Sequence, residues 1–236
     1  MAVLIIPVAV SVHTVVSWIF GMTLRVGWQS TIFGPYFVVG AIFSGIATII
    51  IVMAAVRWRF HLEGEIKPLH FRNLGLMLLA LDIALMYFTL SEYLTASYMG
   101  ESRDVSWLSL LSSGPFAPMF WGMILGGLLA PAVILGVTKA RSVRWTVIAA
   151  VLVNIGMWFE RYLIVVPSMA TPQMPTGVAG YWPTWVEWSI LAAAVAGFTL
   201  LLVVFSKLFP IVSIWEVQES ASTAPQATPV VQEATA

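Results

Sequence analysis

The sequence predicts an all-α, polytopic membrane protein with six transmembrane helices, from its composition, its hydropathy and its aromatic content. Of the 236 residues, 60% are hydrophobic and 9% are charged, and the mean hydropathy is +0.93, whereas a soluble domain usually carries about 25% charged residues. The 11 tryptophans, 13 phenylalanines and 6 tyrosines suit a membrane protein with aromatic belts. Equal numbers of acidic and basic residues exclude a nucleic-acid binder, and the lack of cysteine excludes disulfides and thiolate-bound metals.

Three spans are expected in the first half of the chain, because a bilayer core about 30 Å thick needs roughly 20 apolar residues per helix. The first, residues 1–24, carries no formal charge and ends before Arg25. The second, 36–56, begins after a Gly-Pro pair and ends at a basic turn. The third, 73–98, contains two acidic residues.

Three more spans are expected in the second half. The fourth, 116–138, follows a Ser-Gly-Pro turn, the fifth, 145–166, contains an adjacent acid and arginine, and the sixth, 185–209, follows a loop rich in Pro, Gly and Met. Gly122 and Gly126 in the fourth span have the spacing typical of close helix contacts. Residues 1–218 therefore form one helical bundle, with spans two to five as a four-helix unit. The polar tail 219–236 is expected to be disordered and cytoplasmic.

Basic residues set the expected orientation, since they concentrate in cytoplasmic loops. Eight lie on one side of the spans: Arg57, Arg59, Lys67, Arg72, Lys139, Arg141, Arg144 and Lys207. Arg25, Arg103 and Arg161 lie at or near the other side. Both termini are therefore expected in the cytoplasm, with segments 25–35, 99–115 and 167–184 outside. Met1 opens into an apolar helix without the basic flank of a signal peptide. We therefore expect the later part of a longer bundle, whose earlier helices are absent or supplied by another chain.

Five ionisable side chains lie inside the expected spans, where each costs roughly 3 kcal/mol. They are His13, Asp82, Glu92, Glu160 and Arg161. His13 and Asp82 fall near mid-membrane, and the other three lie about one and a half turns below the outer surface. Neighbouring residues on a helix point about 100° apart. Arg161 is therefore expected to pair with an acid on another helix, Glu92 first and Glu187 second.

Two interpretations of these charges remain open. In the first, they are structural, held in interhelical pairs, and His13 is hydrogen-bonded within the core. In the second, Asp82, Glu92 and Glu160 form a proton path, because three acids beside one cation leave carboxylates that hold protons. No metal site and no catalytic residue is predicted. A haem bridged by two histidines is disfavoured because His61 and His70 lie in the charged loop.

Seven stretches, in this order along the chain, resemble the NrfD/PsrC-type polysulfide reductase family, and in particular the quinol-binding membrane subunit of alternative complex III. They are Ser11–Trp18, Ser30–Phe37, Val39–Gly45, His70–Gly75, Tyr87–Thr95, Met157–Arg161 and Pro183–Trp188. The resemblance covers only the later helices of these longer proteins. Two positions depart from the family pattern: Ile19 stands where an acid is frequent, and Gln29 stands where a histidine is frequent.

The resemblance implies a membrane subunit of a quinol-oxidising respiratory complex in a bacterial cell membrane, not catalytic alone. Quinol is then the substrate, and His13, Trp18 and Tyr36 are the implied quinol-binding residues. No covalent cofactor is implied; iron–sulfur clusters and haems belong to partners, which are an iron–sulfur subunit, a multihaem cytochrome c subunit and further membrane subunits. Two other function classes explain the same buried charges: a proton-conducting or transport bundle without a redox role, and a purely structural membrane anchor.

Overall fold

The computed structural model describes residues 2–137, 142–171 and 183–208, and the regular structure within these ranges is helical. The chain divides into two compact units, Met1–Tyr181 and Trp182–Ala236. The expected disordered tail, 219–236, lies outside the described residues.

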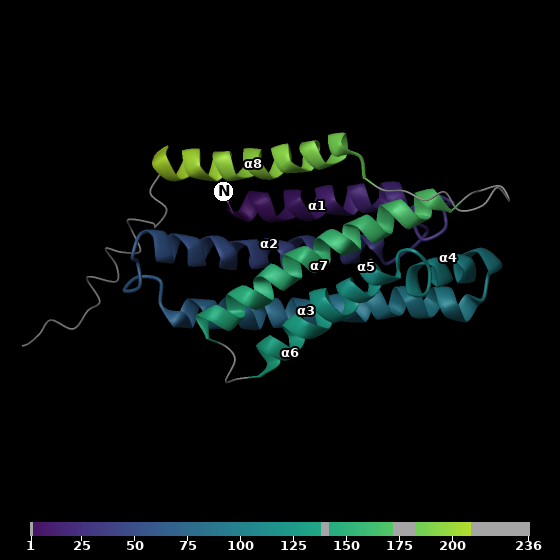
Figure 1. Cartoon of the computed structure of the whole chain (residues 1–236), viewed down its shortest axis with the longest axis horizontal. Helices are drawn as coiled ribbons and strands as arrows, with labels where there is room; N and C mark the ends of the chain where they lie inside the picture. Colours follow the sequence, from purple (N-terminus) through teal and green to yellow (C-terminus); the bar gives the residue numbers. More distant parts are fainter. Residues whose placement is uncertain (1, 138–141, 172–182, 209–236) are drawn as a thin grey trace, which may run out of the picture. The chain divides into compact units, whose positions relative to one another are not determined.

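Nine helical segments follow one another along the described chain (Figure 1). They are α1 (Ala2–Gly21), α2 (Phe33–Arg59), α3 (Pro68–Met99), α4 (Ser102–Ser112), α5 (Ala117–Trp121), the π-helical η1 (Gly122–Leu129), α6 (Ala130–Gly136), α7 (Val143–Ala170) and α8 (Trp185–Leu208). Segments α5, η1 and α6 together form one continuous helical span. Within the described ranges, six helices are therefore long and apolar enough to cross a membrane, which confirms the expected all-α membrane fold.

Several helices begin or end at other residues than the sequence predicted, and proline or glycine lies at most of these ends. Helix α3 begins at Pro68, because a proline in the first turn gives up an N–H that has no partner within the helix. It ends where Gly100 adopts a left-handed conformation at φ 63°. Helix α2 begins at Phe33, so Gly34 and Pro35 lie in its first turn and do not precede it. Helix α4 forms within residues 99–115, which we expected to be a loop.

The fourth span departs from regular α-helix between Gly122 and Leu129, where the hydrogen bonds are π-helical. The N–H of Ala130 accordingly donates to the carbonyl of Leu125, five residues earlier. Regular α-helix resumes at Ala130, and Pro131, the next residue, has no N–H to donate to the preceding turn. Short π-helical segments within α-helices are frequently found at functional sites.

The expected four-helix unit is formed by α2, α3, α7 and the continuous span from α5 to α6. Helix α7 contacts α2, α3, η1 and α6, and it crosses α2 obliquely in Figure 1. Fully buried apolar side chains from all four spans fill the centre: Phe43, Ile50, Phe71, Leu78, Leu85, Leu135, Ala149 and Val153. A second cluster joins α4 and α5 to the end of α7 around Trp107, Leu111 and Phe120.

Helix α1 packs against α2, and most of its apolar side chains are exposed on the chain's own surface. In a bilayer such a face contacts lipid or other helices. In the second unit, no described residue of α8 is buried within the chain. The start of α8 is closed by the Glu187 carboxylate, which accepts a hydrogen bond from the backbone N–H of Thr184 at 2.7 Å. This is half of a capping box.

Candidate functional site

The segment between α1 and α2 is fastened to the end of α7 by three hydrogen bonds. Arg25 Nε donates to the Ser168 carbonyl at 3.1 Å, and Trp28 Nε1 donates to the Ile164 carbonyl at 2.6 Å. In return, Ser168 Oγ donates to the Val26 carbonyl at 2.6 Å. Ser168 is among the last four residues of α7, whose carbonyls have no partner within the helix, and a cation such as Arg25 is favoured near them. We call these three bonds the α7 clasp.

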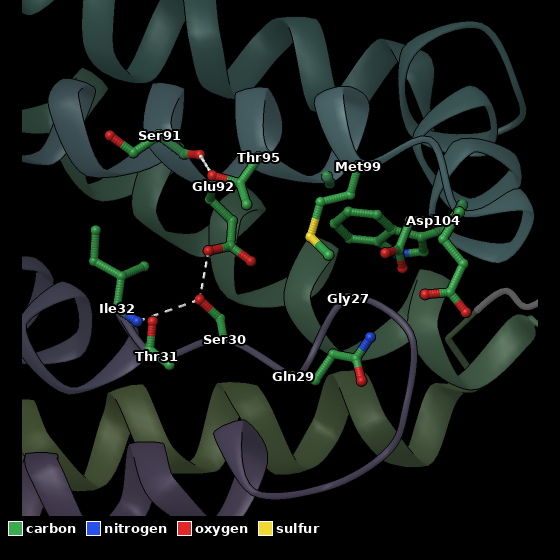
Figure 2. Close-up of a pocket in the computed structure, with 13 residues that line it drawn as sticks. Gly27, Gln29, Ser30, Thr31, Ile32, Ser91, Glu92, Thr95, Met99 and Asp104 are labelled. Atoms are coloured by element: carbon green, nitrogen blue, oxygen red, sulfur yellow. Dashed lines mark hydrogen bonds between the residues drawn. The ribbon is translucent and has the colours of Figure 1, made fainter.

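Beyond the clasp, a cavity of about 310 Å³ opens between residues 27–32, the end of α3 and α4 (Figure 2). We call it the α4 cavity. Its lining includes the carboxylates of Glu92, Glu101 and Asp104 and no basic side chain. Partial burial raises the pKa of the Asp104 carboxyl, and the nearby Glu101 carboxylate raises it further. The α4 cavity therefore disfavours anions and suits neutral or hydrogen-bond-donating molecules.

Glu92 is held at the wall of the α4 cavity by a serine from the opposite segment. Ser30 Oγ donates to Glu92 Oε2 at 2.5 Å, and Ser30 Oγ accepts a hydrogen bond from the Ile32 N–H at 3.4 Å (Figure 2). A hydrogen bond to a charged carboxylate is stronger than one between neutral groups. The contact therefore ties the segment before α2 to α3.

A second, smaller cavity of about 20 Å³ lies deeper in the bundle and shares Gly27, Glu92 and Trp107 with the α4 cavity. Tyr36 and Thr89 are among its further lining residues. This volume is enough for one water molecule, provided that polar groups surround it. The small cavity therefore joins Glu92 to the hydroxyl groups of α2 and α3.

These hydroxyl groups lead to the buried carboxylate of Glu160. Thr89 Oγ1 donates to the Leu85 carbonyl at 2.8 Å, so Tyr36 supplies the proton in its 3.4 Å contact with Thr89 Oγ1. The Tyr36 hydroxyl and the Glu160 carboxylate are neighbours that interact electrostatically. Glu160 is 4% exposed, and neither of its oxygens makes a hydrogen bond of ordinary geometry to the described residues.

The structure corrects the expected partner of Arg161. Arg161 Nε lies 3.3 Å from Glu160 Oε2, so the adjacent residues form an ion pair, whereas Glu92 is bonded to Ser30. The long arginine side chain turns back along α7, with its Cζ 4.4 Å from the centroid of the Phe37 ring. Gly40 leaves the space, because a Cβ at this position would lie 2.9 Å from Arg161 Nη2. Pairing of Arg161 with Glu187 stays a prediction, since Glu187 belongs to the other unit.

Three of the expected site residues lie apart from this cluster, and none of them lines either cavity. His13 Nδ1 donates to the Ala9 carbonyl at 2.7 Å, which leaves Nε2 of a neutral imidazole as an acceptor. Trp18 is 53% exposed and packs beside Gly34. Asp82 is fully buried, and its carboxylate oxygens have no hydrogen-bond partner among the described residues.

Sequence reasoning missed several polar residues that the structure brings to the bundle interior. Thr89 lies one turn before Glu92 on α3. This three-residue spacing places both side chains on one face of the helix and was visible in the sequence. Asn154 Nδ2 on α7 donates to Thr48 Oγ1 on α2 at 3.2 Å, which links these helices deeper in the bundle. Trp107, which lines both cavities, lay in a segment that we expected to be a loop. Within the described ranges, His, Asp and Glu form no group suited to a metal ion.

A family model described as "Polysulphide reductase, NrfD" matches residues 1–173, from α1 through the end of α7. The chain belongs to the NrfD polysulphide reductase family. The NrfD match includes both cavities, the Glu160–Arg161 pair and the α7 clasp, and it confirms the resemblance found in the sequence. As a member of this family with six apolar helices, the chain is a multi-pass membrane protein.

One curated relative is the "Hdr-like menaquinol oxidoreductase integral membrane subunit" of Archaeoglobus fulgidus. It is 25% identical over 231 residues, an alignment that covers 89% of this NrfD chain and 57% of the relative. The chain therefore spans just over half of the length of this relative.

Proposed function

We propose that the chain is an integral membrane subunit of a quinol-oxidising respiratory complex of the alternative complex III or polysulfide reductase type. Membership of the NrfD family and the name of the A. fulgidus relative support this reading. The observation that carries it is the polar line from Glu160 through Tyr36 and the small cavity to Glu92. A purely structural membrane anchor does not require ionisable side chains inside its spans, because each of them costs free energy in the bilayer.

The line offers a route for the protons that quinol oxidation releases. Glu160 takes up a proton, which passes by way of the Tyr36 hydroxyl and a water in the small cavity to Glu92. Glu92 then releases it into the α4 cavity. Asp82 lies seven residues before Thr89, about 10 Å along α3, with the buried Leu85 between them. In this proposal Asp82 is a further proton-holding group beside the path, and a proton reaches it from Thr89 only when the Leu85 side chain moves.

The quinol-binding residues of this proposal are His13, Trp18 and Tyr36. The Nε2 atom of a neutral His13 accepts the hydrogen bond of a quinol hydroxyl, and the exposed Trp18 ring offers an apolar surface for the head group. The electrons go to partners, because the redox chemistry belongs to the quinone and to clusters outside this chain. The proposed partners are an iron–sulfur subunit, a multihaem cytochrome c subunit and further membrane subunits, in a bacterial cell membrane with both termini cytoplasmic.

Quinol binding separates this proposal from a proton-conducting bundle and from an anchor. We expect a short-chain quinol analogue to quench the tryptophan fluorescence of the full chain in lipid nanodiscs, saturably and with competition from unlabelled quinone. An unchanged spectrum at all concentrations, with no binding by calorimetry, overturns the quinol proposal.

Proton conduction is tested in the assembled complex. Glu160→Gln keeps the shape of the side chain and removes its titration, so quinol oxidation should slow by at least about tenfold. Glu65→Gln, an exposed acid in the turn between α2 and α3, is the matched control. Equal rates in both variants contradict the proton path and favour the anchor.

A further inference from the structure

The end of the bundle at which α2 ends and α3 and α7 begin carries a surplus of cations (Figure 1). Two acids, Glu63 and Glu65, lie in the turn between α2 and α3, and neither forms an ion pair with a described residue. Five basic side chains outnumber them, and we call these five the basic end. They are Arg57, Arg59, Lys67, Arg72 and Arg144.

The starts of α3 and α7 lie side by side within this end of the bundle. Gly75, in the second turn of α3, packs on Thr146, in the first turn of α7, because a Cβ on Gly75 would lie 3.3 Å from Thr146 Cγ2. The first turn of a helix favours acidic side chains, yet neither of these helices has one there. Lys67 and Arg144 stand at the two starts instead, so the described helix ends add to the positive potential of the basic end.

Arg57 is held in place by the turn that follows α2. The Leu62 N–H donates to the Arg57 carbonyl at 3.1 Å, and His61 adopts a left-handed φ of 53°, which is uncommon for a residue other than glycine. The Arg57 Cζ lies 6.0 Å from the centroid of the Phe71 ring, and its Nε is buried without a hydrogen-bond partner among the described residues. Arg57 as a whole is only half-buried, and no described carboxylate pairs with it. Its terminal nitrogens therefore keep their donors for a ligand at the surface.

Exposed apolar side chains lie among these cations. Trp58, next to Arg57, is 78% exposed. On α3, the spacing of three and four residues places Leu69, Arg72 and Leu76 on one face, and all three are exposed. Tryptophan and basic side chains at the end of a span are typical of the head-group level of a bilayer, whereas leucines further along the span contact acyl chains. The ligand that fits the basic end is therefore amphipathic, with an anionic head and apolar tails.

We propose that the basic end binds an anionic phospholipid, with the Arg57 guanidinium donating to phosphate oxygens and the acyl chains lying along Leu69 and Leu76. A planar guanidinium presents parallel N–H donors that match two oxygens of one phosphate. Basic pockets at the ends of membrane spans suit such head groups. A zwitterionic lipid fits less well, because the other cations of the basic end repel its ammonium group. The α4 cavity lies at the other end of α3, so lipid binding here is independent of the proposed function.

The test compares two lipids beside a single fluorophore. The chain has no cysteine, so Asn73→Cys, on the exposed face between Leu69 and Leu76, takes one bimane label. The labelled full chain is placed in nanodiscs of mixed lipid in which either phosphatidylglycerol or phosphatidylcholine carries brominated acyl chains. We expect brominated phosphatidylglycerol to quench the label with an apparent affinity roughly fivefold higher than that of brominated phosphatidylcholine. Equal quenching by the two lipids overturns the proposal.

Variants of Arg57 test the phosphate contact. Arg57→Gln removes the charge and the paired donors, so the preference for phosphatidylglycerol should fall to near parity. Arg57→Lys keeps the charge without the planar fork, so part of the preference should remain. Arg103→Gln is the matched control, because Arg103 is exposed at the start of α4 and lies outside the basic end. If Arg57→Gln and Arg103→Gln change the preference equally, or not at all, the proposal is overturned.

A second variant guards against a misfolded Arg57→Gln. Lys67 and Arg72 are exposed, so the double change Lys67→Gln and Arg72→Gln removes two cations without touching the core, and it should also abolish the preference. A double variant that keeps the full preference shows that the basic end does not hold the lipid. Inorganic phosphate, compared with chloride at equal ionic strength, separates a lipid site from a site for the free ion. The lipid preference should persist in phosphate, and its selective loss there overturns the lipid proposal in favour of a free-phosphate site.

Discussion

Gly127 of η1 and Gly156 of α7 meet backbone to backbone. A Cβ built on Gly127 would lie 2.5 Å from the Gly156 Cα, and one built on Gly156 would lie 2.2 Å from the Gly127 Cα. Real Cβ atoms do not come so close to a neighbouring backbone, so the two helices pack at this distance only because both residues lack a side chain. The π-helical turns of η1 present Gly127 to α7, whereas Gly126 has no neighbour within 4 Å of its Cβ position.

Gly156→Ala should therefore push α7 away from η1. We expect a loss of about 1–3 kcal/mol in the free energy of unfolding, the usual cost of overpacking. The measurement is reversible unfolding in mixed micelles. Gly126→Ala is the control in the adjacent position, and it should be neutral or slightly stabilising because alanine favours helix over glycine. Equal losses in the two variants would show that the glycine contact does not set the helix distance.

The Arg161–Glu160 pair predicts which second substitution rescues a defect at Arg161. Arg161→Leu leaves the buried Glu160 carboxylate without its cation, with an expected cost of about 3 kcal/mol in the free energy of unfolding. Adding Glu160→Gln should recover part of this loss, and adding Glu92→Gln should not, because Glu92 is bonded to Ser30. Rescue by Glu92→Gln alone in a double-mutant cycle would restore the original expectation of an Arg161–Glu92 pair.

Asp104 gives a pH dependence with a definite sign. Because the folded-state pKa of Asp104 is raised, the folded state favours the protonated form. The contribution of this protonated carboxyl to the free energy of unfolding is fully present below the unfolded-state pKa of about 4. This contribution is lost as the pH rises through the folded-state pKa. Asp104→Asn should thus raise the thermal midpoint at neutral pH, and the difference from the wild type should vanish in acid. A difference that grows in acid would contradict this assignment.

The expected topology can be tested with single cysteines, because the chain has none of its own. With both termini cytoplasmic, Ser102→Cys at the start of α4 should react with an impermeant maleimide from outside intact cells. Gly64→Cys, in the turn between α2 and α3, should react only after permeabilisation. The reverse pattern would show that the α4 cavity opens to the cytoplasm.

Composition and hydropathy predicted the six spans and the four-helix unit, because apolar length is a local property of the chain. The interior of the bundle depends on partners that lie far apart in sequence. Neither the Ser30–Glu92 bond nor the Tyr36–Glu160 contact has a local signature, since each joins residues more than 60 positions apart. The pairing of Arg161 with its own neighbour could not be predicted either, because it depends on the space left by Gly40 on another helix.

The α7 clasp ties one wall of the α4 cavity to a helix end that does not line it. Gly27 and residues 29–32 form one wall of that cavity. Trp28, within this segment, and Arg25, just before it, donate to the carbonyls of Ile164 and Ser168, 136 and 143 positions later in the chain. Because the three bonds join the segment before α2 to the last turns of α7, we expect backbone amides in the two stretches to exchange with solvent at a common rate.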